Sequence, residues 1–353
     1  MVPNEDRPLS NGSVRLRLPF MTGTRIVIVA AATAVLLLAA WAASGILFLV
    51  FGAVLLASLL SGAADWLSGR TPLSRGLALT AVILSVLAAM SAAGWLLMPH
   101  IVAQTRELSK ELPDAFAEFT ARLNATAWGA RVVDELHRLE NVTRHGDMLG
   151  TVTGVFSTTL GAVASAFLLL VLTIYLASQP QLYRSGLLQL FVPDRRERLG
   201  EVFDEIGVTL RHWFFGKLIL MCFVAIATSI ALSLLGMPLA FTLGLIAGLF
   251  DFIPNFGPPV AAIPALLIAF VQSPMTAAWV AVIYLAVQVC ENHVLTPLVQ
   301  RRAVDLPPAL TIFSQALMAA LFGLLGVIFA TPLAAAARIA VKRLYVEDHL
   351  ERK

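Results

Sequence analysis

The chain has 353 residues, of which 58% are hydrophobic and 13% are charged, and its mean hydropathy is +0.83. Soluble globular chains carry about 25% charged residues, so this composition indicates a protein whose solvent is the lipid bilayer. The net charge of +3 is small, and no basic stripe interleaved with aromatic residues suggests a nucleic-acid partner. Cys222 and Cys290 form no CxxC pair, and the six histidines show no HExxH spacing. The sequence therefore predicts neither a metal site nor a cofactor.

The first elements are predicted to be a polar tail and three membrane helices. Residues 1–25 are polar, and their arginines precede the first apolar run, which places the tail in the cytoplasm under the positive-inside rule. That run has the pattern of a signal peptide with a cleavage site at 40–42, but apolar sequence resumes directly beyond it. We therefore interpret 26–98 as three membrane helices, of which the first two form a hairpin that breaks near 43–45.

Two polar segments interrupt the apolar sequence further along the chain. Residues 99–150 place apolar residues three and four positions apart among mixed charges, a pattern that predicts an amphipathic helical insert. A fourth membrane helix is predicted over 151–178, and a second amphipathic insert over 179–212 contains three closely spaced arginines. Counting the basic residues places the first insert outside and the second in the cytoplasm.

The C-terminal half, 213–337, begins with a fifth membrane helix and continues with two apolar segments that Gly and Pro interrupt. The first of them, 239–271, would be about 50 Å long as one helix, whereas the hydrocarbon core is about 30 Å thick. Each interrupted segment, 239–271 and 307–337, is therefore either a kinked span or a re-entrant hairpin of two half-helices. The hairpin is favoured, because it keeps the arginines at 301–302 on the cytoplasmic side with the tail at 338–353.

The two interrupted segments share a short pattern, a glycine followed by five residues and a proline. It occurs at 248–254 (GLFDFIP) and at 326–332 (GVIFATP). Gly/Pro-interrupted segments in comparable positions point to the binding site of a transporter. The glycine pair Gly244 and Gly248, spaced four residues apart, instead predicts close packing between helices.

Two acids, Asp251 and Glu291, are the only charged residues other than histidine between positions 218 and 300. An ionised side chain at the bilayer centre costs at least about 2.5–3.5 kcal/mol, so an unpaired acid there should take up a proton or hold a cation. The structural alternative is that Asp251 caps a half-helix and that Glu291 lies near the membrane surface. We favour a functional role for Asp251, because it coincides with the helix break, and leave both interpretations of Glu291 open. The candidate solute- or ion-binding residues are these acids and three amides: Asn255, Gln288 and Asn292.

The break itself follows from its prolines, which remove backbone donors and clash with the preceding turn. Carbonyl and N–H groups that a broken helix frees are tolerated at membrane depth only inside protein or beside a water-filled cavity. There they can bind ions and polar groups. We therefore expect the break to be an internal, hydrated feature.

Three stretches of the C-terminal half together resemble the AI-2E family of bacterial transporters: FDFIPNFGPPVAAIP, ENHVLTPLVQRRAVDLPPALTIF and LFGLLGVIFATPLAAAARI. The resemblance covers most of the chain, including the two polar inserts. One departure is Pro307, where family members often have a polar residue. The family's motif positions fall on Ile253, Pro254, Gly257 and Pro258, on Glu291, Asn292 and Pro297, and on Gly323, Gly326 and Pro332.

This resemblance implies a multi-pass protein of the bacterial inner membrane that forms a homo-oligomer, with a pentamer as one form. It also implies export of a small polar signal such as autoinducer-2 in some members and sodium/proton exchange in others. Neither activity is assigned to this chain by the resemblance alone.

The sequence as a whole predicts an all-α polytopic transporter with about eight apolar segments, two of them broken, and with both termini in the cytoplasm. Its expected partners are the lipid bilayer, a small polar solute or cation, and further copies of itself. A cation/proton antiporter that uses Asp251 or Glu291 is the first alternative. A non-transporting envelope scaffold that docks through 99–150 is the second. An intramembrane hydrolase would need a Ser or Asp dyad within a span, and the sequence shows none. No enzyme activity is therefore predicted.

Overall fold

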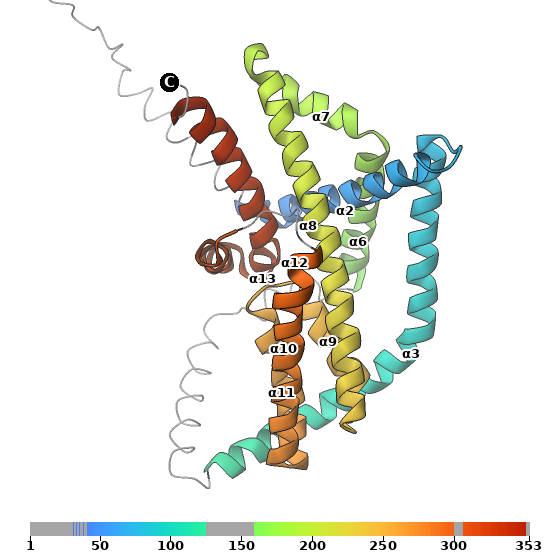
Figure 1. Cartoon of the computed structure of the whole chain (residues 1–353), viewed down its shortest axis with the longest axis vertical. Helices are drawn as coiled ribbons and strands as arrows, with labels where there is room; N and C mark the ends of the chain where they lie inside the picture. The colour runs from blue at the N-terminus through green and yellow to red at the C-terminus, as the bar shows by residue number, and fades with distance from the viewer. Residues whose placement is uncertain are drawn as a thin grey trace, which may run out of the picture. The chain divides into compact units, whose positions relative to one another are not determined.

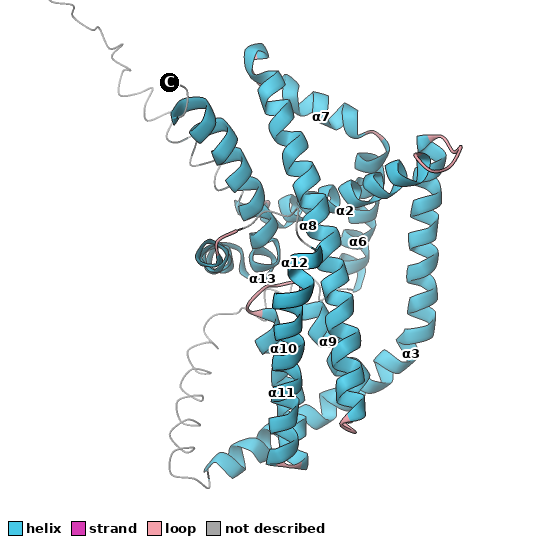
Figure 2. Ribbon diagram, in the orientation of Figure 1, coloured by secondary structure: helices cyan, strands magenta, loops and turns pink. Residues whose placement is uncertain are grey.

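The structure is a computed structural model, which describes residues 41–124, 159–299 and 306–350, together with positions 31, 33, 35 and 38. Every regular element in these ranges is a helix (Figures 1 and 2), so the predicted all-α fold class is confirmed. Residues 48–353 form one compact unit and residues 1–47 another. The α-helices are α2 (Ser44–Ser68), α3 (Arg75–Asn124), α6 (Thr159–Ser178), α7 (Pro180–Gln189), α8 (Pro193–Leu234), α9 (Ala240–Phe250), α10 (Gly257–Gln272), α11 (Pro274–Cys290), α12 (Thr296–Val299) and α13 (Pro308–Val341), and two π-helical stretches are η1 (Glu291–Leu295) and η2 (Lys342–Leu350).

Within the described ranges, five helices are long and apolar enough to cross a membrane: α2, α3, α8, α11 with its continuation through α12, and α13. A sixth span is possible if α6 and α7 are taken together across the 87° bend between them. Two shorter apolar helices, α9 and α10, have 11 and 16 residues. The first predicted apolar segment lies mostly outside the described residues. The chain is thus a polytopic helical membrane protein.

The helix boundaries do not coincide with the changes in polarity along the sequence. Helix α3 continues from the third predicted span through Pro99 and Pro113 to Asn124, well into the predicted insert. A proline inside a helix removes one hydrogen bond and favours a bend, but it need not end the helix. Helix α8 likewise joins the charged sequence after Pro193 to the fifth span as one helix of 42 residues. The remainder of the first insert, 125–150, and the start of the fourth predicted membrane helix, 151–158, lie outside the described residues.

The second half of α3 packs against the C-terminal half of the chain. Phe119 meets Phe270 of α10 with ring centroids 5.1 Å apart. The side-chain oxygen of Gln104 accepts hydrogen bonds from both the backbone N–H and the hydroxyl of Thr242, at 3.1 and 2.7 Å. Because the first N–H groups of a helix lack partners within it, Gln104 satisfies one of the free donors of α9. The first part of the polar insert therefore packs against the first interrupted segment and supports it.

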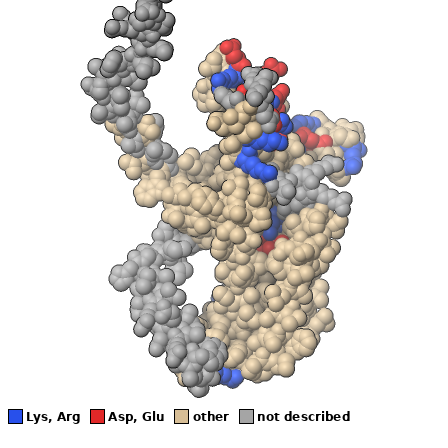
Figure 3. All heavy atoms as spheres, turned by 60° about the vertical axis from the view of Figure 1, so that its left-hand side comes forward, with Lys and Arg blue, Asp and Glu red and all other residues tan. Residues whose placement is uncertain are grey.

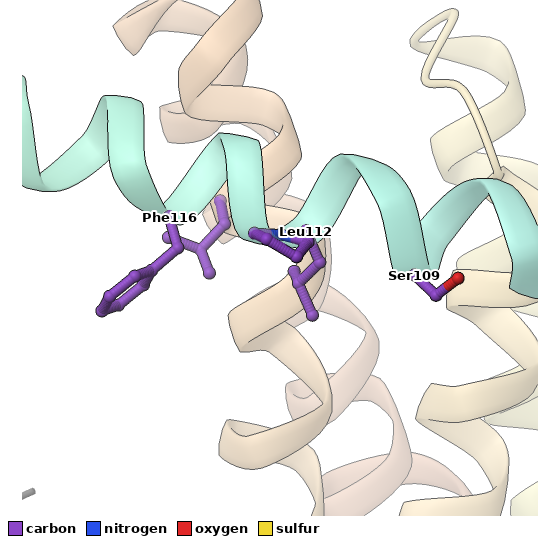
Figure 4. A pocket seen from close by; sticks show the side chains of 5 residues that line it. Ser109, Leu112 and Phe116 are labelled. Carbon is purple, nitrogen blue, oxygen red and sulfur yellow. The ribbon is translucent and has the colours of Figure 1, made fainter.

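An apolar hollow of about 350 Å³ lies where α3 crosses α10. Ser109, Leu112 and Phe116 lie along one side of α3 in Figure 4, and Pro113 and Leu267 complete the lining. Their three- and four-residue spacing is that of the predicted amphipathic helix. The hollow contains no charged side chain, so it is a poor candidate for polar chemistry.

The first interrupted segment is two separate helices, α9 and α10, joined by a turn over 251–256. The helices pack against each other, as the re-entrant alternative requires and a straight span does not allow. Asn255 takes the left-handed conformation (φ 68°), which Asn tolerates better than most residues. The backbone at Gly257 lies so close to the carbonyl of Phe250 that a Cβ atom would overlap it. The turn therefore requires glycine at that position.

The second interrupted segment breaks at a different kind of site. Helix α13 is two helical pieces that meet at Gly323, where φ is 60° and ψ is −143°. Pro332 lies inside the second piece, and the whole of 326–332 is helical. The shared Gly/Pro pattern is therefore not a structural repeat, because Pro254 lies in a turn and Pro332 in a continuous helix.

Candidate functional site

Close packing of α9 on α8 positions the charged residues of the chain's apolar half. Gly248 of α9 lies so near α8 that a Cβ atom would be 2.5 Å from the carbonyl oxygen of Met221 and 2.6 Å from Cβ of Ala225. Met221 and Ala225 lie one and two turns beyond Lys217 on the same ridge of α8, because residues four apart share one helix face. The glycine contact therefore aligns Lys217 with the C-terminal end of α9, where Asp251 follows. The predicted packing role of the glycine pair is confirmed by this geometry.

Lys217, Asp251 and Glu291 form a buried charge cluster. The Nζ atom of Lys217 lies 2.9 Å from Oδ2 of Asp251 and 3.6 Å from Oε1 of Glu291. The three side chains are only 5%, 2% and 4% exposed. The Nε2 atom of Gln288 donates a hydrogen bond of 2.7 Å to the second carboxylate oxygen of Glu291. Two carboxylates thus share one ammonium group, and Glu291 also accepts from one neutral amide donor.

Aromatic residues adjoin two members of this cluster along the chain. Phe252, which follows Asp251, meets Trp213 at 5.9 Å and Phe214 at 6.4 Å between ring centroids, in edge-to-face arrangements. Trp213 lies one turn before Lys217 on α8. Because little water reaches the ion pair, its electrostatic attraction is strengthened and the cost of leaving either charge unpaired is raised.

A further polar contact joins the break to α13. Gln315 is 1% exposed, and its Nε2 atom donates a hydrogen bond of 3.0 Å to the carbonyl oxygen of Pro254. The break between α9 and α10 is therefore held by groups from three other places: Lys217 of α8, Glu291 at the end of α11, and Gln315 of α13.

The structure brings together three of the five predicted binding residues: Asp251, Glu291 and Gln288. Asn255 and Asn292 are exposed and take part in none of these contacts. Glu291 is buried within the protein beside Lys217, and its depth in the membrane stays a prediction. Glu291 is also the first residue of the π-helical stretch. Such widened turns are rare in proteins but frequent at functional sites.

No Lys or Arg lies near Asp251 in the sequence, but the fold brings one to it, Lys217. Lys217 lies 34 positions earlier in the sequence, one residue before the stretch in which the sequence has no Lys or Arg. The available signal was an isolated lysine within the apolar run WFFGKLILM, because a membrane-embedded lysine usually has a partner. Pairing across helices, however, cannot be read from distance along the chain.

The remaining motif residues shape the backbone around the cluster. Gly326 lies so close to the carbonyl of Met318 that a Cβ atom would overlap it, so this glycine permits the sharp bend after Gly323. Ile253 and Pro258 lie in the turn and in the first turn of α10. Pro297 lies in α12, and Pro332 is buried in α13. These positions support a broken-helix architecture more than direct chemistry.

Spanning helices, a helix interrupted within the apolar half, and charges buried at the interruption are features of membrane transport proteins. The sequence pattern that defines the AI-2E family transporters matches residues 30–345, and the chain belongs to that family. The predicted family membership is confirmed.

Relatives in other bacteria are named as transport proteins. The chain is 26% identical to the Bacillus subtilis protein named "Putative transport protein YrrI" over 81% of its own length and 83% of the relative's. It is 24% identical to the Synechocystis protein named "Putative transport protein sll0060" over 79% and 83% of the two lengths. A segment covering 40% of the chain is 28% identical to the Escherichia coli protein named "Putative permease PerM", over 41% of that protein.

Proposed function

We propose that this protein moves a small polar solute across the membrane through a polar centre formed by Lys217, Asp251 and Glu291. The observation that carries the proposal is the position of three buried charges at the turn between two half-helices. Burying an ion pair is often neutral or destabilising relative to an apolar pair of the same size. A structural role alone therefore gives little reason to keep these charges, whereas a transport path needs polar groups in its wall.

The cluster suits transport because its contacts can be exchanged. Lys217 lies closer to Asp251 than to Glu291, so one carboxylate is tightly paired and the other is held more loosely. A solute that brings hydrogen-bond donors can replace part of the contact between Lys217 and Glu291 without leaving either charge unpaired. A quorum-sensing signal of the autoinducer-2 type is the first solute to test, in view of the family.

Cation/proton antiport is the second candidate, and one observation favours it. The cluster holds two carboxylates and one ammonium group, so it carries one excess negative charge when all three groups are ionised. One proton or one monovalent cation would balance that charge.

The experiment is transport by purified protein reconstituted in liposomes. Labelled autoinducer-2 and gradients of sodium and protons are offered separately, and protein-free liposomes provide the control. Solute movement that depends on the protein and is lost in Asp251→Asn supports the first candidate. Proton movement driven by a sodium gradient supports the second. Absence of both would count against the proposed function and favour the scaffold alternative.

We further propose that the protein lies in the bacterial inner membrane with both termini in the cytoplasm. Arg198 pairs with Asp348 at 3.2 Å, and Arg343 pairs with Glu205 at 2.7 Å. The start of α8 and the end of the chain therefore share one side of the membrane. The basic residues beside Arg198 favour the cytoplasmic side.

Single cysteines at Asn124 and Glu197, in a variant without Cys222 and Cys290, test this orientation in whole cells. An impermeant thiol reagent should label position 124 and leave position 197 unlabelled. The opposite pattern would contradict the proposed topology. The mass of the purified protein in detergent tests the proposed homo-oligomer in parallel.

A further inference from the structure

The side-chain amide of Gln315 has one atom engaged and one atom free. Its Nε2 atom donates to the carbonyl oxygen of Pro254, which can only accept, so this contact fixes the orientation of the amide. The opposite atom, Oε1, is buried and has no hydrogen-bond partner among the described residues. The residue as a whole is 1% exposed. Gln315 therefore presents a buried acceptor that nothing in the described chain satisfies.

An unsatisfied buried acceptor is uncommon and costly. Leaving such a group without a partner costs about 1–3 kcal/mol, and native proteins keep only a few of them. Leucine or methionine at position 315 would avoid this cost, although either would leave Pro254 without the bond from α13. The free oxygen therefore suggests a partner other than the described residues of the chain.

The place of Gln315 in the fold indicates where that partner binds. It lies in the piece of α13 that precedes the bend at Gly323, and its amide reaches the turn between α9 and α10. Pro254 follows Asp251 by three residues in the same turn. Gln315 thus joins the two interrupted segments of the chain through Pro254, which lies three residues after Asp251 of the buried charge cluster.

We propose that Oε1 of Gln315 is a binding group for the transported ligand, and that this ligand presents hydrogen-bond donors or positive charge. The inference rests on the proposed function and adds the chemical class of the ligand. The carbonyl of Pro254 already accepts bonds from Gln315 and from the N–H of Phe256. Asp251 and Glu291 are acceptors that share one ammonium group. Unused capacity at the break is therefore acceptor capacity, which suits a hydroxyl-bearing solute or a monovalent cation and disfavours a carboxylate or phosphate.

Ligand-induced thermal stabilisation of the full-length protein in detergent tests this proposal without requiring transport. One arm uses NaCl, LiCl and KCl against choline chloride at equal ionic strength. A second arm uses D-ribose and myo-inositol as hydroxyl-bearing solutes, and a third uses the choline salts of lactate and phosphate. We expect a saturable rise of the unfolding midpoint in the cation arm or the hydroxyl arm and none in the anion arm.

Two substitutions at the site and one elsewhere make the test specific. Gln315→Met keeps the length of the side chain but removes the acceptor, and should raise the half-saturating concentration about tenfold or more, as expected for the loss of one buried hydrogen bond. Gln315→Glu keeps the oxygen atoms and should still respond, although it loses the bond to Pro254. Gln272→Met is the matched control, because Gln272 is exposed at the end of α10.

The proposal is overturned if Gln315→Met responds like the parent, if only anions stabilise the protein, or if no arm gives a saturable response. Should Gln315→Met fail to fold, loss of the response in a folded Gln315→Glu variant overturns it instead. A protein that shows the expected binding but no transport in liposomes would contradict the proposed function and leave this inference standing.

Discussion

Helix α8 takes part in two groups of charges that face opposite physical conditions. Towards its start, Arg198 and Glu205 pair with three residues at the end of the chain, Arg343, Glu347 and Asp348, to form an exposed charge network. Further along the same helix, Lys217 belongs to the buried charge cluster with Asp251 and Glu291. Figure 3 shows charged side chains gathered mainly at one end of the surface, while most of the visible remainder is uncharged.

The difference between the two groups lies in what compensates each charge. Side chains of the exposed network are 24–39% exposed, so water and salt can replace any partner that is lost. Side chains of the buried cluster are at most 5% exposed, so each charge depends on the other two. Similar ion pairs on one helix are therefore expected to be dispensable in one place and required in the other.

Removal of Lys217 should have the largest effect. Lys217→Met leaves two buried carboxylates without their shared cation, and breaking a buried ion pair in this way costs about 3–5 kcal/mol. We expect a strong fall in the unfolding midpoint of the detergent-purified protein. Adding Asp251→Asn and Glu291→Gln to the same chain should recover most of the stability while transport stays absent. A single Lys217→Met variant as stable as the parent would remove the distinction between the two groups.

Substitution of Gly248 should have the next largest effect, because this glycine aligns the buried cluster. A Cβ atom in Gly248→Ala would meet the backbone of Met221 and the side chain of Ala225, neither of which can move aside easily. Overpacking of this kind costs about 1–3 kcal/mol. Gly207→Ala on α8 is the control, since nothing lies within 4 Å of the added atom. It should be neutral or stabilising by up to about 1 kcal/mol. Equal effects of the two substitutions on thermal unfolding would argue against close packing of α9 on α8.

Neutralising one acid at a time should lower stability less than the substitutions of Lys217 and Gly248 do, and its main effect should be on transport. Asp251→Asn and Glu291→Gln each leave one carboxylate opposite Lys217, so the protein should still fold and assemble. We expect both to impair transport or its pH dependence in liposomes, with Asp251→Asn the more severe because its carboxylate lies closer to Lys217. Size-exclusion chromatography of each variant provides the assembly control. If the Asp251→Asn variant transported like the parent at every pH, the role of Asp251 would be that of a structural cap.

The smallest effect is expected in the exposed charge network. Glu347→Gln removes the carboxylate that contacts both Arg198 and Arg343, yet water can solvate both arginines. Thermal stability and transport should be nearly unchanged at physiological salt. The mobility of a spin label at Leu350 should rise with salt concentration in the parent and start higher in the variant, because salt screens exposed pairs. A salt-independent label in the parent would show that these pairs do not hold the end of the chain.

Much of the architecture was predictable from local sequence. Apolar length and low charge indicate membrane helices, and the prolines around Asn255 predict a break that the structure confirms between α9 and α10. The glycine spacing at Gly244 and Gly248 predicts a packing face, which α9 indeed uses against α8. Less was predictable where polarity changes within one helix, as in α3 and α8, because a helix continues as long as no backbone feature ends it.

By itself, then, the sequence determined that this is an all-α membrane protein of the AI-2E family with an interrupted C-terminal half, because composition, periodicity and motifs are local properties of the chain. Only the tertiary structure decided that Asp251 is paired, that Glu291 is buried with it, and that Gln315 reaches Pro254. These contacts join residues that are distant in the sequence, from 34 to 74 positions apart in the charge cluster. They depend on how the helices are aligned, which the Gly248 contact on α8 helps to set. Helix packing, and not sequence proximity, selects the partner of each buried charge.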